Sequence, residues 1–195
     1  MNEPAALAHL GQFEPFGALI ARHGPPEAAR NSDPFLALSK ALVYQQLSGA
    51  AATTIWRRLG ALFPGGEPCP EHLAALSDEE LRTAGVSRQK AGYLRSLADA
   101  YNSGAVPRSL AHLSDDEIRG VLLPIKGIGP WSVDMFLMFD LGRLDVWPTG
   151  DLGIQKAVSR LVGKPLKPRE LEPIAEPWRP YRSVAAWYLW RSLED

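Results

Sequence analysis

Residues 123–155 read LPIKGIGPWSVDMFLMFDLGRLDVWPTGDLGIQ, and this stretch decides the fold. It opens with Gly127 and Gly129, which allow backbone conformations that a Cβ would oppose. Pro130 then suits the first turn of a helix. Apolar residues follow at helical spacing: Val133, Phe136 and Leu137. The pattern predicts a tight glycine hairpin followed by a helix.

A second helix is predicted just before the hairpin. Ser114 and Glu117 have the spacing of a capping box, and the helix that they open ends near Leu122. Because Gly142 can end the later helix, residues 114–141 are predicted to form helix, hairpin and helix. A hairpin at a helix N-terminus presents backbone N–H groups and a positive dipole end to an anion. We therefore expect it to bind phosphates of a nucleic-acid backbone.

These residues carry a resemblance to a known family. Residues 123–129 resemble the hairpin of the helix-hairpin-helix DNA glycosylases. Residues 146–154, VWPTGDLGI, are similar to the segment that carries the catalytic aspartate of that superfamily. Within it, the chain most resembles the DNA-3-methyladenine glycosylase II type, from about Asp33 to the C-terminus. A hairpin alone also occurs in plain DNA-binding modules, so the combination with an aspartate carries the resemblance.

The resemblance implies an all-α, two-lobed helix-hairpin-helix glycosylase fold with the active-site cleft between the lobes. The whole chain, 1–195, would be a single glycosylase module. Lobe A would span about 35–140, and lobe B about 1–34 plus 142–195. We expect no separate N-terminal β-rich domain, although many relatives carry one. The sequence itself agrees, because its strand signals are negligible.

Composition narrows the class of protein. The 195 residues are 46% hydrophobic and 22% charged, which is typical of a globular domain. A single cysteine, Cys69, excludes a disulfide framework and a four-cysteine cluster. With no membrane-length apolar run and no signal-peptide pattern, we expect a cytoplasmic protein, associated with the nucleoid in a bacterium, and no membrane partner. The net charge of −1 is low for a DNA-binding protein, although a basic face can coexist with it.

Asp151 is the predicted catalytic residue. Cleavage of an N-glycosidic bond develops positive charge on the sugar, which a nearby carboxylate stabilises. The alternative is that Asp151 only caps the helix that follows it. Its spacing from the hairpin favours catalysis. Asp134 and Asp145 are the weaker candidates.

Aromatic side chains are predicted to hold the extruded base, as enzymes that act on a base require. By their place in the motif, Trp131 and Trp190 match pocket residues of the resembled family, and Met135 and Leu152 suggest a roomier pocket. A stacked indole attracts a cationic alkylated purine more than a neutral base. The alternative for any tryptophan is that it packs the interior.

The resemblance also implies contacts along the DNA. Gln46, with Leu47 beside it, matches the wedge that fills the gap left by the extruded base, although both could lie on a solvated helix face. Contacts to the DNA backbone are implied for two segments, which the composition alone would also allow as solvated faces. They are Ser87, Arg88 and Lys90, and Lys126, Gly127, Ile128 and Gly129.

The implied function is that of a monofunctional DNA glycosylase in base excision repair. It would hydrolyse the N-glycosidic bond of alkylated purines, such as 3-methyladenine or 7-methylguanine, in duplex DNA and leave an abasic site. No lyase activity is expected, because Trp131 stands where bifunctional relatives carry a Schiff-base lysine. The alternatives are a DNA-binding module without catalysis and a glycosylase for mismatched or oxidised bases.

The partner that we expect is double-stranded DNA with alkylated bases, bound by a monomer. No catalytic cofactor is expected. A structural Na⁺ or K⁺ is implied at the hairpin, held by the backbone carbonyls of Leu123, Ile125 and Ile128.

Overall fold

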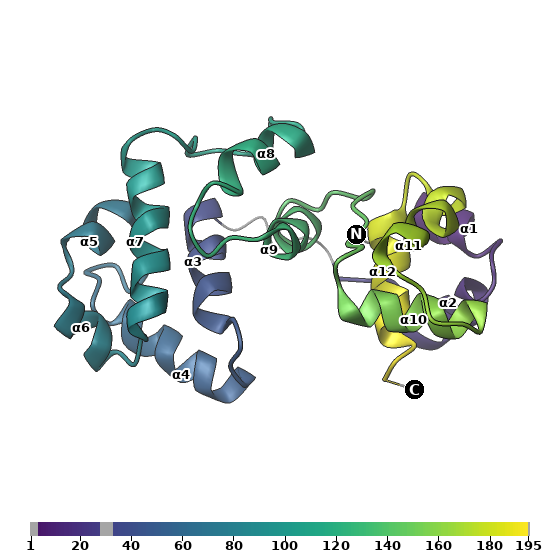
Figure 1. Cartoon of the computed structure of the whole chain (residues 1–195), viewed down its shortest axis with the longest axis horizontal. Coiled ribbons are helices and arrows are strands. Elements are labelled where there is room, and N and C mark those ends of the chain that lie inside the picture. The colour runs from purple at the N-terminus through teal and green to yellow at the C-terminus, as the bar shows by residue number, and fades with distance from the viewer. Residues whose placement is uncertain (1–3, 28–32, 195) are drawn as a thin grey trace. The chain divides into compact units, whose positions relative to one another are not determined.

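The computed structural model describes residues 4–27 and 33–194, and every regular element in them is a helix (Figure 1). The all-α prediction is therefore confirmed for this part of the chain. In chain order the helices are α1 (Pro4–Leu10), α2 (Phe16–His23), α3 (Pro34–Tyr44), α4 (Gly49–Gly60), α5 (Pro70–Ala75), α6 (Asp78–Thr83), α7 (Arg88–Asn102), α8 (Asp115–Leu122), α9 (Pro130–Met135), the π-helix η1 (Phe136–Asp140), α10 (Leu152–Val162), α11 (Pro168–Ala175), the 3₁₀-helix η2 (Glu176–Trp178) and α12 (Arg182–Arg191).

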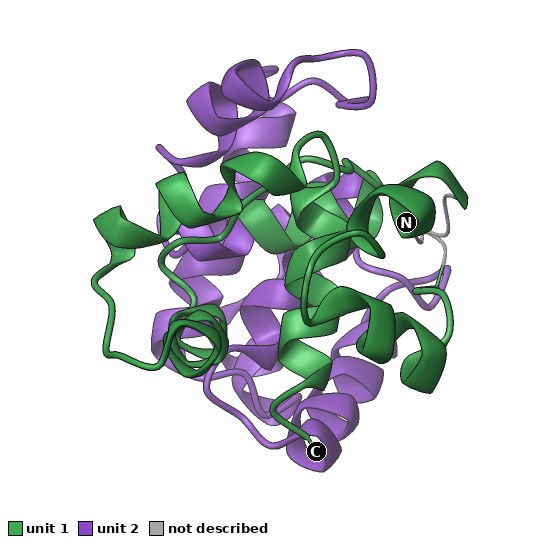
Figure 2. Ribbon diagram, turned by 90° about the vertical axis from the view of Figure 1, so that its right-hand side faces the viewer, with its two compact units in different colours: residues 1–31, 134–195 green, residues 32–133 purple. Residues whose placement is uncertain are grey.

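The chain divides into two compact units (Figure 2). Unit 1 comprises residues 1–31 and 134–195, and unit 2 comprises residues 32–133. From the sequence, we predicted that the chain passes from one lobe to the other near residues 34 and 141. The first observed crossing falls within 28–32, outside the described residues, and the second lies inside α9. None of the helices described is long and apolar enough to cross a membrane.

Helix α7 forms the centre of unit 2. It packs against α3, α5 and α6. Leu94, Leu97 and Ala98 recur at helical spacing on α7 and are fully buried, so this face of the helix supplies much of the unit's core. Phe35 of α3 meets Tyr101 of α7 edge to face, with ring centroids 5.3 Å apart.

The starts of four helices in unit 2 carry capping side chains, among them the predicted capping box at Ser114. Asp33 and Ser87 each accept a hydrogen bond from the backbone N–H three residues later. Ser77 and Ser114 form complete capping boxes with the glutamates three residues on. These side chains satisfy N–H groups that the first turn of a helix would leave without partners.

Helix α12 forms the centre of unit 1. It packs against α2 and α10, and its residues from Arg182 to Ala186 are buried. A helix that is covered on all sides lies inside a domain rather than on its surface. Trp147 and Trp178 are also buried, and their rings meet edge to face with centroids 5.4 Å apart.

Two short helices, α5 and α11, were not predicted, because their prolines resemble those of a loop. Pro70 and Pro168 lie in the first turn of these helices, where a missing N–H costs little. Pro173 lies inside α11 and removes one backbone hydrogen bond. Leu171 and Ala175 are fully buried on α11, and their burial offsets that loss.

The second helix of the hairpin unit also differs from the prediction. The spacing predicted one α-helix ending at Gly142, but after Met135 the backbone widens into the π-helix η1. A π-turn rotates the following side chains relative to an uninterrupted α-helix, and such turns are frequent at functional sites. Gly142 follows with a φ of 68°, the left-handed conformation expected of a glycine beyond a helix end.

A buried ion pair ties α12 to the segment before it. Arg182, with 7% of its side chain exposed, donates from Nε to Oδ1 of Asp145 at 2.7 Å. Arg179 donates from Nη1 to Oδ2 of the same carboxylate at 2.7 Å. Removing one partner of a buried pair leaves the other charge uncompensated, which is the costly case.

We expect Asp145→Ala to lower the free energy of unfolding by about 3 kcal/mol, because the Arg182 guanidinium stays buried without its main partner. Urea denaturation followed by circular dichroism measures this. The matched control is Glu194→Ala, which breaks the exposed pair with Arg191 and should cost less than about 1 kcal/mol. Equal losses for the two variants would contradict the prediction.

The hairpin lies directly against α7. Gly127 has a φ of 93°, and a Cβ built on it would lie 2.5 Å from Cδ2 of Tyr93. Two separate constraints therefore require glycine here, the backbone conformation and the space. Ile125 and Ile128, on either side, are buried and anchor the hairpin in the unit.

Gly127→Ala should lower the free energy of unfolding by about 2 kcal/mol or more, because the left-handed backbone and the Tyr93 ring both oppose the methyl group. Gly129→Ala is the matched control. A Cβ at Gly129 meets nothing within 4 Å, so we expect a change within about 0.5 kcal/mol. Thermal denaturation of both variants tests this, and a stable Gly127→Ala protein would show that the hairpin can move away from α7.

Candidate active site

Asp151 lies at the N-terminus of α10 and is held by two hydrogen bonds. Its Oδ1 atom accepts one from the backbone N–H of Ile154 at 2.8 Å and one from the indole Nε1–H of Trp190 at 2.8 Å. The first bond makes Asp151 the cap of α10, as the alternative interpretation required. The second bond joins it to a predicted pocket residue on α12. Capping alone does not account for the contact with Trp190.

Gly153 makes this approach possible. A Cβ on Gly153 would lie 2.9 Å from Oδ1 of Asp151 and 2.9 Å from Cδ1 of Trp190. A larger residue would therefore push the indole away from the carboxylate. Gly153 was not among the residues predicted for the site. The glycine two residues after the aspartate was the available signal.

The loop before Asp151 is also fixed. The Asp151 N–H donates to the Pro148 carbonyl at 3.0 Å, and Nε2 of Gln155 donates to the Thr149 carbonyl at 3.1 Å. The carboxylate is thus positioned from both sides, by the turn that precedes it and by the helix that follows it. A group held this way needs little reorganisation when charge develops nearby.

Phe139 adds a second aromatic ring to this site. Its ring centroid lies 6.0 Å from that of Trp190, with an angle of 31° between the planes. Phe139 belongs to η1, so the π-turn sets its direction. Phe139 was not predicted for the site, because the residue spacing indicates a regular α-helix at this point. Asp151, Trp190 and Phe139 therefore meet within unit 1.

The other predicted pocket residues have different surroundings. In unit 1, Met135 is half-buried and Leu152 is 79% exposed. Trp131 belongs to unit 2 and is 48% exposed, which is high for a tryptophan and unlike Trp147 or Trp178. Exposed aromatic and apolar side chains of this size are available to a ligand.

The two weaker candidates for the catalytic carboxylate, Asp145 and Asp134, are bonded to arginines and buried, respectively. Both oxygens of Asp145 accept from arginines, which gives this residue a structural role. Asp134 is 7% exposed at the end of α9. Asp151 is only partly buried and lies beside Trp190, so its surroundings suit a reacting group best among the three.

The predicted wedge lies in the turn that follows α3. Gln46 is exposed and has a φ of 56°, in the left-handed region that residues other than glycine rarely adopt. Leu47, next to it, is 39% exposed. The neighbouring Gln45 donates from Nε2 to the carbonyl of Gly127 at 3.0 Å. The turn is therefore bonded to the hairpin within unit 2.

The residues predicted to contact the DNA backbone fall into two groups. Arg88 and Lys126 are exposed on the surface of unit 2. Ser87 instead caps α7, and Lys90 donates from Nζ to two backbone carbonyls at the end of α3. In the hairpin, the backbone N–H of Lys126 donates to Oγ of Ser96 at 3.2 Å, and the N–H of Ile128 donates to the Ile125 carbonyl at 3.1 Å.

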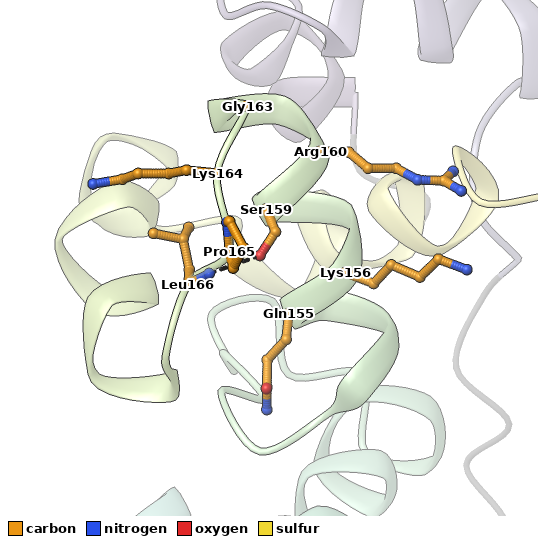
Figure 3. A pocket seen from close by; sticks show the side chains of 8 residues that line it. All are labelled: Gln155, Lys156, Ser159, Arg160, Gly163, Lys164, Pro165 and Leu166. Carbon is orange, nitrogen blue, oxygen red and sulfur yellow. Dashed lines mark hydrogen bonds between the residues drawn. The ribbon is translucent and has the colours of Figure 1, made fainter.

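A shallow pocket of about 460 Å³ lies elsewhere on unit 1, at the C-terminal end of α10 (Figure 3). Its basic side chains do not converge, since Lys156 and Arg160 extend to one side and Lys164 to the other. Ser159 is occupied by a hydrogen bond from the Leu166 N–H at 3.1 Å. Nowhere in residues 4–27 and 33–194 do three His, Cys, Asp or Glu side chains gather as a metal site requires.

Comparison with known proteins gives the same family throughout. The model of the HhH-GPD superfamily of base excision DNA repair proteins matches residues 39–180. The chain is 35% identical to DNA-3-methyladenine glycosylase 1 of Schizosaccharomyces pombe over 89% of this chain and 78% of that protein. It is 34% identical to a putative DNA-3-methyladenine glycosylase of Bacillus subtilis over 91% of this chain and 65% of that protein.

Solved structures of similar proteins point to the same family. The S. pombe 3-methyladenine DNA glycosylase in complex with abasic DNA is 34% identical, with a TM-score of 0.84 over 98% of this chain and 97% of that one. A DNA-3-methyladenine glycosidase from Bacillus halodurans is 35% identical, with a TM-score of 0.86 over 98% of this chain and 89% of that one. The chain therefore belongs to the HhH-GPD superfamily of base excision DNA repair proteins.

Proposed function

We propose that this protein is a monofunctional DNA glycosylase that hydrolyses the N-glycosidic bond of alkylated purines in duplex DNA and leaves an abasic site. One observation carries the proposal. The Asp151 carboxylate is held by the Ile154 N–H and the Trp190 indole, beside a second aromatic ring. Relatives at 34–35% identity are named as 3-methyladenine glycosylases, which supports the same substrate class.

The reaction needs a base outside the duplex and a carboxylate beside its sugar. As the bond between C1′ and the base nitrogen breaks, its electron pair leaves with the base, and positive charge develops on the sugar. The Asp151 carboxylate stabilises that charge. Water then adds to C1′ and releases a proton to solvent. Both products, the free base and the abasic sugar, follow from this hydrolysis.

Selectivity for alkylated purines follows from charge. An N-alkylated purine is cationic, so the departing electron pair neutralises it and no strong general acid is required. The faces of Trp190 and Phe139 attract a cationic ring more than a neutral one. The exposed Leu152 and half-buried Met135 would line the same pocket.

DNA would be bound through the hairpin and the turn after α3. In this proposal Gly127 and Gly129 bring backbone N–H groups close to phosphates, while Lys126 and Arg88 supply positive charge. Gln46 would enter the gap left by the extruded base, with Leu47 beside it. The exposed side chains and left-handed turn described above support this assignment.

A monovalent cation at the hairpin is part of the same proposal. A carbonyl oxygen has two lone pairs, so the Ile125 carbonyl can accept the Ile128 N–H and still face a cation. Together with the carbonyls of Leu123 and Ile128, it would hold Na⁺ or K⁺ next to a phosphate. The cation would neutralise charge and take no part in bond cleavage.

Asp151→Asn should lower the rate of base release by about 100-fold or more, because the charge beside the sugar is lost. Asparagine keeps a carbonyl oxygen that can accept from Ile154 and Trp190, so the fold should survive. Single-turnover release of 7-methylguanine from duplex DNA measures the effect, with Asp99→Asn on the exposed side of α7 as control. Full activity of the Asp151 variant would exclude this role. Strand cleavage by the parent protein would exclude the monofunctional reaction.

Trp190→Phe should lower release of the cationic base by about tenfold, because Asp151 loses the indole N–H donor while an aromatic ring remains. Trp187→Phe is the matched control on the same helix, since Trp187 contacts Tyr188 and Arg191. Equal rates for both variants would show that the indole N–H does not matter.

A further inference from the structure

The turn after α3 holds an unfavourable backbone conformation at the residue that would enter the DNA. Gln46 has a φ of 56°, and in the described part of the chain no other residue except glycine has a positive φ. Its side chain and those of Leu47 and Ser48 are exposed, so packing of these side chains does not hold the turn. A strained conformation persists only where surrounding bonds determine it.

Lys90 supplies two of those bonds from α7. Its Nζ donates to the carbonyl of Val43 at 2.6 Å and to the carbonyl of Gln45 at 2.8 Å. These carbonyls belong to the C-terminal end of α3, where backbone acceptors lack partners within the helix. The two bonds use two of the three donors of the ammonium group. Partial burial at this place also lowers the pKa of Lys90.

Gln45 supplies a third bond, on the other side of the turn. Its Nε2 donates to the Gly127 carbonyl at 3.0 Å, across 82 positions of sequence. Gly127 in turn lies against the ring of Tyr93. The residue immediately before Gln46 is therefore fixed through its carbonyl by Lys90 and through its side chain by the hairpin.

One face of α7 supports both elements that would contact DNA. Lys90, Tyr93 and Ser96 follow one another at intervals of three residues, which places them along one side of the helix. Lys90 bonds the turn, Tyr93 contacts Gly127, and Ser96 accepts from the backbone N–H of Lys126. The turn and the hairpin thus share one rigid support.

We propose that Lys90 and Gln45 are positioning residues that hold Gln46 in the conformation needed to enter the gap in the duplex. This inference rests on the proposed function. It gives Lys90 a role different from a phosphate contact, since its ammonium is directed at two carbonyls of its own chain. Without the clamp formed by Lys90 and Gln45, Gln46 relaxes to a right-handed conformation and its side chain leaves the position from which it would enter.

The test compares one lesion in two contexts. A wedge matters most where the base must be unpaired and unstacked, and less where a mismatch has already lowered that cost. Lys90→Met removes the donors and keeps the length of the side chain. We expect it to slow single-turnover release of 7-methylguanine opposite cytosine by about tenfold, and release from a mismatched duplex by about twofold or less.

Three further variants make the result specific. Gln46→Gly removes the wedge side chain and should likewise slow release opposite cytosine more than release from the mismatched duplex. Adding Lys90→Met to it should slow release little further, because both substitutions act on the same turn. Lys90→Arg should restore most of the rate. Lys156→Met removes an equal charge from an exposed site on α10 and should change neither rate. Equal slowing in both contexts by Lys90→Met would mean general destabilisation and would overturn the proposal.

Salt dependence separates the clamp from a phosphate contact. Loss of a phosphate-bound lysine reduces the slope of log K against log salt concentration by about one. Lys126→Met should show this reduction, whereas Lys90→Met should leave the slope unchanged. A reduced slope for Lys90→Met would overturn the proposal.

A readout without catalysis keeps the clamp testable if the parent protein releases no base. DNA carrying an abasic-site analogue opposite 2-aminopurine reports unstacking of the opposite base as a rise in fluorescence. The parent protein should give this rise on binding, and Lys90→Met should give a smaller one at saturating protein. Absence of any rise for the parent, or an equal rise for both, would overturn the inference independently of the proposed reaction.

Discussion

The hairpin lies so close to α7 that Gly127 has no room for a Cβ beside the ring of Tyr93. That constraint fixes where the hairpin backbone can be, because glycine alone meets both the space and the left-handed φ of 93°. The side chains of Ile125 and Ile128 are buried and anchor the hairpin in unit 2. The turn after α3 depends on this contact as well, since Gln45 is bonded to the carbonyl of Gly127.

At Asp151, one side-chain geometry serves two roles. The sequence left open whether this aspartate caps a helix or performs chemistry, and the structure shows that the two roles use the same geometry. Capping places Oδ1 at a defined point, and the Trp190 indole then bonds to that point. A carboxylate held by an N–H from each of two helices is oriented before any substrate arrives, which is what electrostatic stabilisation requires. The cap therefore serves the proposed reaction.

A local signal allowed the helix start at Ser114 to be predicted, because a capping side chain acts within three residues. The same kind of signal begins the helices after Asp33, Ser77 and Ser87. Features that depend on distant partners were missed. Phe139 reaches Trp190 through a π-turn that no residue spacing announces, and α11 forms around Pro173 because tertiary burial outweighs propensity. Lys90 resembled a surface cation in sequence, since the carbonyls that it bonds lie 45 and 47 positions away.

The net charge of −1 by itself argues against a DNA-binding protein. Part of the positive charge is bound within the chain. Lys90 of α7 donates to a backbone carbonyl at the end of α3, and Arg182 and Arg179 pair with Asp145. A hairpin that binds phosphate through backbone N–H groups needs few cations, because its donors carry no formal charge. In this fold, affinity for DNA would depend on how accurately backbone groups and one turn are held. The positions that matter most are consequently the ones that fix them, Gly127, Tyr93, Gln45 and Lys90, and total charge is a poor guide to function here.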